Sequence, residues 1–99
     1  MTSIQEQTCP LCGTNAEFKS HEGGRLKHFV CSVCLDYNIW RVAEEELSRL
    51  PKAIATPLRA EYSALAKAAS NDSDLLEVCI ERNPNGSVAL QAKVVHRSK

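Results

Sequence analysis

The chain has 99 residues, 43% of them hydrophobic, but only two Phe, two Tyr and one Trp, so we expect one small domain with a modest core. Its 12 basic and 12 acidic residues balance, whereas a dedicated nucleic-acid-binding protein is normally clearly basic. No apolar run approaches the length of a membrane-spanning helix, so we expect no membrane span. Residues 1–7 are polar, and we expect ordered structure to begin near Thr8.

Two Cys-x-x-Cys pairs follow along the chain. Cys9 and Cys12 form the first pair, Cys31 and Cys34 form the second, and 18 residues separate the two pairs. This spacing is typical of a site in which four thiolates hold one Zn²⁺ ion tetrahedrally. Because the protein would fill all four positions, the zinc is predicted to be structural, with no coordination position left for catalysis.

The residues around the two pairs differ in their backbone preferences. Pro10 and Gly13 suit a tight turn that points the first two sulfurs into the same space. No glycine follows the second pair, so Leu35 is expected to carry a backbone cost unless that turn is more open.

Disulfides and a thioredoxin-like redox motif are the alternatives to a metal site, and both fit less well. No basic and apolar secretory signal opens the chain, which favours a reducing cytoplasm where disulfides are rare. A redox motif needs one Cys-x-x-Cys beside a βαβ pattern, whereas here two copies flank a predicted hairpin. Iron is the main alternative metal for a site of four thiolates.

The remaining potential ligands are poorly spaced for a metal. His28 lies three residues before Cys31 and could in principle replace a ligand, while His21 and His96 are isolated in polar segments. Cys79, the fifth cysteine, alternates with glutamates in a strand-like run. We expect a half-buried structural thiol there, because no neighbouring base would make it a nucleophile.

Three short strands are predicted around the cysteines. Residues 16–19 and 27–30 form a hairpin across a polar loop that contains Gly23 and Gly24. Residues 37–42 alternate in character and are predicted to add a third strand beside that hairpin.

Two helices are predicted after these strands. Residues 43–50 carry an apolar stripe, and Pro51 ends or kinks this first helix. Thr56 and Pro57 are predicted to be the N-cap and the first residue of a second helix, which runs to about Ser70.

A hairpin is predicted at the C-terminal end. Residues 76–81 and 88–95 alternate between apolar and other side chains, and residues 83–86 fit a type I turn closed by a glycine bulge. Since a lone hairpin is marginally stable, its apolar face must pack on the second helix, extend the first sheet, or pair with another copy. The sequence leaves these three arrangements open.

The Cys-Pro-x-Cys-Gly turn, the spacing of the two pairs and the intervening hairpin resemble the zinc-ribbon superfamily over about residues 8–42. The resemblance implies one structural Zn²⁺ held by Cys9, Cys12, Cys31 and Cys34. It also implies binding of nucleic acid or protein, because zinc ribbons occur in transcription factors, RNA polymerase subunits, ribosomal proteins, topoisomerases and terminal modules of bacterial and phage proteins. The missing glycine after Cys34 is the one departure.

The expected fold class is therefore α+β in a single domain spanning residues 1–99. Residues 8–42 are predicted to form a zinc-ribbon hairpin within a three-stranded sheet. Residues 43–70 are predicted to contribute two short helices, and residues 75–96 the C-terminal hairpin.

Two kinds of partner are compatible with the sequence. Residues that could contact a partner are Lys19, Arg25, Lys27, His28, Tyr37 and Trp40. The basic residues alternate with Phe18 and Phe29, a pattern that favours nucleic acid, whereas Tyr37 and Trp40 could anchor a protein partner. Four thiolates and one Zn²⁺ would bring the folded charge to about −2, which disfavours nucleic acid.

The favoured hypothesis is a non-catalytic cytoplasmic adaptor, inhibitor or regulator of bacterial or phage origin that binds another protein. Nucleic-acid binding is the alternative, and a homodimer is compatible with either. We expect no enzyme, because the sequence has no glycine-rich phosphate loop and no paired nucleophile and base.

Overall fold

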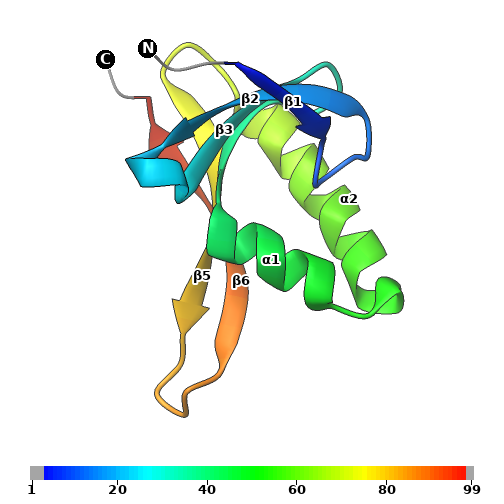
Figure 1. The fold of residues 1–99 in the computed structure, drawn as a ribbon, viewed down its shortest axis with the longest axis vertical. Helices are drawn as coiled ribbons and strands as arrows, with labels where there is room; N and C mark the ends of the chain where they lie inside the picture. The colour runs from blue at the N-terminus through cyan, green and yellow to red at the C-terminus, as the bar shows by residue number, and fades with distance from the viewer. Residues whose placement is uncertain (1–3, 98–99) are drawn as a thin grey trace.

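Residues 4–97 are described by a computed structural model, and within them six strands form one mixed sheet with two helices packed on one face (Figure 1). The strands are β1 (Gln5–Thr8), β2 (Asn15–His21), β3 (Leu26–Cys31), β4 (Leu35–Trp40), β5 (Asp74–Arg82) and β6 (Val88–His96), and their order in the sheet follows their order in the chain. A short 3-10 turn, η1 (Glu22–Gly24), links β2 to β3. This arrangement confirms the α+β fold class.

The C-terminal hairpin extends the N-terminal sheet, which resolves the question that the sequence left open. β5 pairs with β4 in parallel, with Tyr37 opposite Leu76 and Ile39 opposite Val78, while all other neighbours are antiparallel. A parallel pair needs a long crossover connection, and α1 (Arg41–Arg49) and α2 (Lys52–Ala69) supply it.

The core lies between the helices and one face of the sheet. Alternate residues of the strands meet there, and the largest fully buried side chains include Tyr37, Phe29, Ile39, Leu47 and Val78. The Phe29 ring stacks on Tyr37 with centroids 5.5 Å apart, and it lies 5.2 Å from Phe18. These aromatic contacts connect β2, β3 and β4, and Tyr37 also contacts the sulfur of Cys9.

The N-terminal boundary differs from the prediction. Residues 5–8 form β1, an edge strand paired with β2, rather than an unordered lead into Thr8. Polar side chains are compatible with this edge position because the hydrogen bonds between β1 and β2 are made by the backbone. Gln7 also bridges two elements, accepting a hydrogen bond from Lys27 Nζ at 2.9 Å and donating one to Glu44 Oε2 at 2.6 Å.

The hairpin of β2 and β3 and the β5–β6 hairpin are confirmed, with strands longer than predicted. At the C-terminal turn, the N–H of Gly86 donates to the carbonyl of Asn83 at 2.9 Å, and Gly86 has φ of 86°, as the predicted glycine bulge requires. The third strand ends at Trp40 rather than at residue 42, because α1 already begins at Arg41.

The predicted start of the second helix at Thr56 is wrong. α2 begins at Lys52, directly after Pro51, and contains Pro57 in its second turn. Leu50 has the extended backbone that a following proline favours, which separates the two helices. Pro57 removes the N–H that would reach the carbonyl of Ala53, but both residues are solvent-exposed, so water can satisfy that carbonyl.

Within the part of the chain that the structure describes, neither helix is long and apolar enough to cross a membrane.

The buried position of Leu47 can be tested against an exposed leucine. Leu47→Ala should lower the free energy of unfolding by about 2 to 5 kcal/mol, because Leu47 is 0% exposed in the core. The control Leu65→Ala removes the same atoms from a helical position that is 44% exposed, and should cost about 1 kcal/mol or less. Urea denaturation followed by Trp40 fluorescence measures both, and equal losses would contradict the described core.

Candidate metal centre

The structure brings Cys9, Cys12, Cys31 and Cys34 together, with all four sulfurs within 4.8 Å of one another. The first two cysteines lie in the turn after β1, Cys31 ends β3, and Cys34 lies immediately before β4. The Sγ atoms of Cys9 and Cys34 are 3.8 Å apart, and those of Cys12 and Cys31 are 3.4 Å apart. A tetrahedron with metal–sulfur bonds of about 2.3 Å has edges of about 3.8 Å, so this donor set fits one tetrahedral ion.

Burial makes a cation at this site favourable. Cys9, Cys31 and Cys34 are at most 4% exposed, and none of the four cysteines forms a disulfide. Burial raises the pKa of the Cys9 thiol, and it raises that of the Cys34 thiol well above its usual range. Burial also opposes ionisation of Cys12, but hydrogen bonds from Thr14 help to lower its pKa to about 7. A divalent cation would offset the cost of holding several thiolates together in this buried position.

The two cysteine turns have the backbone geometry that the sequence indicated. In the first, the N–H of Gly13 donates to the carbonyl of Cys9 at 2.9 Å, and Gly13 has φ of 79°. In the second, Leu35 has φ of 62°, so the missing glycine does carry a backbone cost there. The N–H of Val33 points to Sγ of Cys31 at 3.4 Å and closes this turn over the sulfur.

Two hydroxyl groups contact the sulfurs, and neither was predicted. Tyr37 Oη lies 3.0 Å from Cys9 Sγ, and Ser63 Oγ lies 3.0 Å from Cys34 Sγ. Burial and the neighbouring Cys9 raise the pKa of Tyr37 far above its usual value, so its hydroxyl keeps the proton that it can donate to a thiolate. Such contacts orient metal ligands and stabilise their charge. Through Ser63, α2 is fastened to the metal centre.

No family model, curated protein or solved structure matches this chain, so the assignment of the site depends on the geometry of the four cysteines.

The predicted basic and aromatic surface is divided between the two faces of the sheet. Phe18 pairs with Phe29, and both side chains are buried against the helices. Lys27 lies on that same face, 4.8 Å from the Phe18 ring centroid and 3.0 Å from a Glu44 oxygen. Lys19 and His28 are partners on the opposite face. The basic residues and the two phenylalanines therefore do not form one surface.

The other residues predicted to contact partners also differ in exposure. Arg25 is exposed at the end of η1. Tyr37 is 0% exposed, which corrects the expectation that it could anchor a partner, since its ring and hydroxyl serve the core and the cysteines. Trp40 is half-buried and packs against the core.

Cys79 and the histidines lie away from the four sulfurs. Among the described residues, only Cys9, Cys12, Cys31 and Cys34 form a cluster suited to a metal. The Cys79 thiol is half-buried, its nearest polar contact is Gln91 Oε1 at 3.9 Å, and burial raises its pKa. These features agree with a structural thiol rather than a nucleophile.

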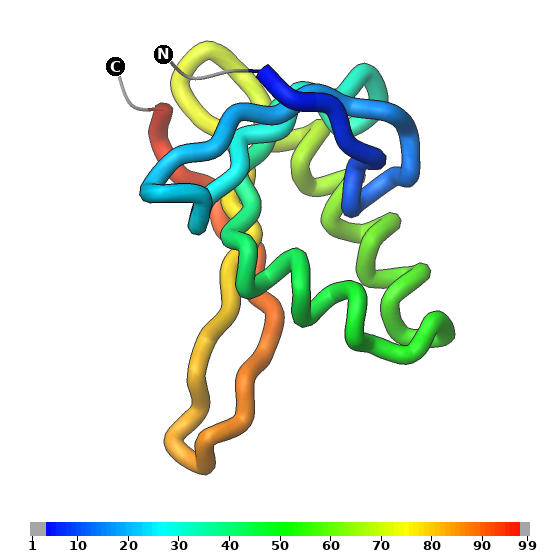
Figure 2. Tube along the Cα trace, in the orientation of Figure 1, coloured from blue at the N-terminus to red at the C-terminus, as the bar shows by residue number. Residues whose placement is uncertain are grey.

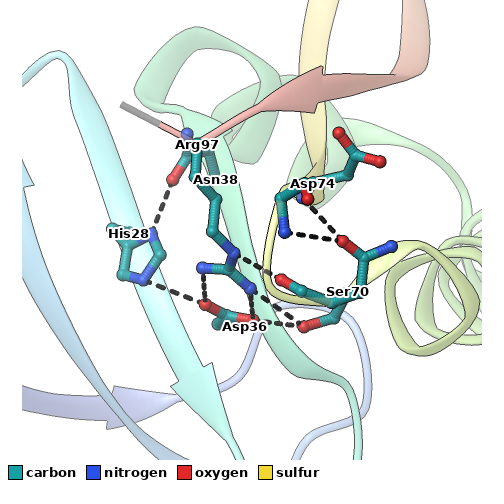
Figure 3. A network of polar contacts seen from close by, with 8 residues as sticks. His28, Asp36, Asn38, Ser70, Asp74 and Arg97 are labelled. Carbon is teal, nitrogen blue, oxygen red and sulfur yellow. Dashed lines mark hydrogen bonds and ion pairs between the residues drawn. The ribbon is translucent and has the colours of Figure 1, made fainter. Parts of the chain in front are cut away.

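A polar network beside the metal centre joins β3, β4, the end of α2 and the chain after β6 (Figure 3). Asp36, on β4, accepts hydrogen bonds from Arg97 Nη2 at 2.7 Å and from Ser70 Oγ. Arg97 Nε also donates to the carbonyl of Asn71 at 2.6 Å, and His28 Nε2 lies 3.6 Å from Asp36 Oδ2. The network fastens the chain after β6 and the end of α2 to the strand that carries the second cysteine turn.

Removal of the Tyr37 hydroxyl tests its role at the metal centre. Tyr37→Phe should raise the dissociation constant for Zn²⁺ about tenfold, because the Cys9 thiolate loses a hydrogen-bond donor. Competition with a chromogenic chelator measures the constant. The control Tyr62→Phe changes a tyrosine on α2 that is 5% exposed and outside the contacts to sulfur, and it should leave the affinity unchanged. Equal effects in both variants would exclude the assigned role.

Replacement of Arg97 tests the polar network. The hydrogen bond from Arg97 is the largest cause that lowers the Asp36 pKa from 3.8 to about 2. Arg97→Met should therefore lower the free energy of unfolding by about 1 to 2 kcal/mol at neutral pH, measured by urea denaturation. The control His96→Ala, at a side chain that is 92% exposed, should cost much less.

The pH dependence of this loss follows from the lowered pKa. Ionised Asp36 contributes its stability fully above the unfolded pKa near 4, and the contribution disappears as the pH falls toward about 2. The difference between wild type and Arg97→Met should thus be constant from about pH 5 to about pH 8 and shrink below about pH 4. A difference that grows in acid would contradict this origin.

Proposed function

We propose that the protein is a small, non-catalytic, zinc-stabilised module that binds an extended segment of another protein. One Zn²⁺ ion is held by Cys9, Cys12, Cys31 and Cys34, because four thiolates in a tetrahedral arrangement suit zinc, with iron as the competing metal. Residues 8–42 then form a zinc ribbon, in which the two cysteine turns flank the β2–β3 hairpin and β4 adds the third strand. Free thiols and a thiolate metal site suit a cytoplasmic protein.

The observation that supports a protein partner is a groove between the cysteine turns and α2, with a volume of about 560 Å³. Leu11, Val33, Ala60 and Ala64 supply apolar lining, and Val33 is 46% exposed. Such a surface can receive an apolar side chain from a partner.

The charges at the groove indicate which partner would fit. Arg59 and Lys67 line the groove from α2, and its lining contains no acidic residue. Within the described part of the chain, neither Arg59 nor Lys67 forms an ion pair. Two residues eight positions apart on a helix are about 12 Å apart along its axis and about 80° apart around it, so both can line one broad groove. The groove therefore suits a peptide in which an apolar residue is accompanied by Asp or Glu.

The arrangement of polar groups supports a function without catalysis. Four cysteines would leave a bound metal without a vacant position. Ser70, Asp36 and His28 include the residue types of a catalytic triad, but Ser70 Oγ donates to Asp36 rather than to His28. Asp36, with a pKa of about 2, is also a poor base.

Nucleic-acid binding is the second candidate, and one observation favours it. A cavity of about 510 Å³ on the opposite face of the sheet is lined by Lys19, His28 and Arg97, among others. Glu22 and Glu77 line the same cavity, and the Phe18 and Phe29 rings are buried on the other face, where they cannot stack on bases. We therefore place this function second to protein binding.

Selection from a displayed library of random peptides on the immobilised, zinc-loaded protein tests the main proposal. The enriched sequences should combine an apolar residue with Asp or Glu, because the groove offers apolar lining and two cations. Arg59→Glu should weaken binding of a selected peptide at least about tenfold. The matched control Arg49→Glu changes an arginine on α1 whose side chain is 76% exposed and away from the groove, and it should bind normally.

Two results would contradict protein binding at the groove. One is a set of enriched peptides without acidic residues, and the other is equal binding by both glutamate variants. A labelled single strand that binds at micromolar concentration, with an affinity that falls steeply with salt, would instead support the nucleic-acid candidate.

A further inference from the structure

The outer edge of β6 is an unpaired strand edge in the described part of the protein. β6 is the last strand of the sheet, pairs with β5 on one side, and spans nine residues. Figure 2 shows the β5–β6 hairpin extending beyond the rest of the domain. A two-stranded hairpin with an open edge is marginally stable in water and can template pairing with another strand.

The hydrogen bonds at both ends of the hairpin identify which backbone groups point outward. The N–H of Asn83 donates to the carbonyl of Ser87, and the N–H of Arg97 donates to the carbonyl of Ser73. Hydrogen-bonded pairs alternate along an antiparallel ladder, so the odd-numbered residues of β6 bond to β5. The N–H and C=O groups that face the open edge consequently belong to Val88, Leu90, Ala92, Val94 and His96.

The side chains along this edge carry little to prevent association. Lys93 is the only lysine, arginine or acidic residue in β6, although charged side chains commonly protect edge strands. Val94 is 59% exposed and Val88 is 36% exposed, both on the face of the sheet that carries the helices. An exposed edge of this length and composition is unusual for a strand that stays unpaired.

We propose that β6 pairs antiparallel with β6 of a second copy about a two-fold axis at Ala92, joining the two sheets into one. This register places Val88 opposite His96 and Leu90 opposite Val94, so all five outward-facing residues of each strand are paired. Val94 then packs against Leu90 of the second copy. The partner is a second copy of this chain because the strand complements itself in this register.

Charge selects this register over its neighbours. With the axis at Ala92, Lys93 lies opposite Gln91 of the second copy, so no like charges meet. A shift that puts the axis at residue 93 would bring the two Lys93 side chains directly opposite each other, which is unfavourable. A shift that puts the axis at residue 91 would place His96 opposite Gly86, which lies in the turn outside β6.

The dimer does not depend on the proposed peptide groove. The groove lies between the cysteine turns and α2, whereas the edge belongs to β6. Loss of either property can therefore be observed without loss of the other.

Substitutions at Gln91 test the register while leaving the core alone, because Gln91 is exposed. In each dimer, residue 91 of either copy lies opposite Lys93 of the other copy. Gln91→Glu would therefore create two contacts between opposite charges, and Gln91→Lys would create two contacts between like charges. Sedimentation equilibrium over a concentration series should show a wild-type dimer. We expect the dissociation constant to be about tenfold lower for Gln91→Glu than for Gln91→Lys.

If the Gln91 substitutions acted only on the stability of the monomer, the lysine variant and not the glutamate variant would be the more favourable one. Within one chain, Gln91 faces Cys79, which lies between Glu77 and Glu81, so lysine should stabilise the isolated hairpin and glutamate should weaken it. A third variant, Val94→Pro, removes an N–H that faces the open edge and keeps the β5–β6 ladder. It should remain folded by circular dichroism and sediment as a monomer.

The outcomes separate clearly. Three results together support the proposal. The wild type is a dimer, the affinity between copies decreases from Gln91→Glu through wild type to Gln91→Lys, and Val94→Pro is a monomer. A wild-type monomer at every concentration, the reverse order of the Gln91 variants, or a proline variant that still dimerises would overturn it.

Discussion

Proximity of the four cysteine sulfurs is the constraint on which the rest of this structure depends. Two turns at the open end of the β2–β3 hairpin, one before β2 and one after β3, must hold their sulfurs within 4.8 Å, and three of the four side chains are almost fully buried. Thiolates gathered in this way repel one another unless a cation lies between them. Metal binding is therefore expected to contribute directly to the free energy of folding, as in other small domains with modest cores.

The metal centre also organises the elements around it. Tyr37 connects the Cys9 sulfur to the aromatic core, and Ser63 connects the Cys34 sulfur to α2. Asp36, two residues after Cys34, accepts hydrogen bonds from Arg97 and Ser70. These bonds hold the chain after β6 close to the second cysteine turn. The centre thus orders the helical crossover and the C-terminal hairpin as well as the hairpin between its ligands.

The sequence predicts local features well and tertiary contacts poorly, for identifiable physical reasons. The cysteine spacing, the glycine bulge at Gly86 and the alternation in β5 are local patterns with few structural solutions. Asp36 and Arg97 are 61 residues apart, and nothing in either neighbourhood indicates that they meet. The basic and aromatic cluster was misleading because adjacent strand residues point to opposite faces, so Lys27 and His28 lie on different sides of the sheet.

The division of the molecule into two faces and one edge has a functional consequence. The groove proposed to bind a peptide lies against α2 and the cysteine turns, while the proposed contact between copies uses only the edge of β6. A dimer would carry two grooves held at a fixed separation by one continuous sheet. A partner with two suitable segments could then bind both, and the second contact would form at a high effective concentration. Weak binding at each groove is in that case compatible with a stable complex, because the rigid sheet reduces the entropy lost on the second contact.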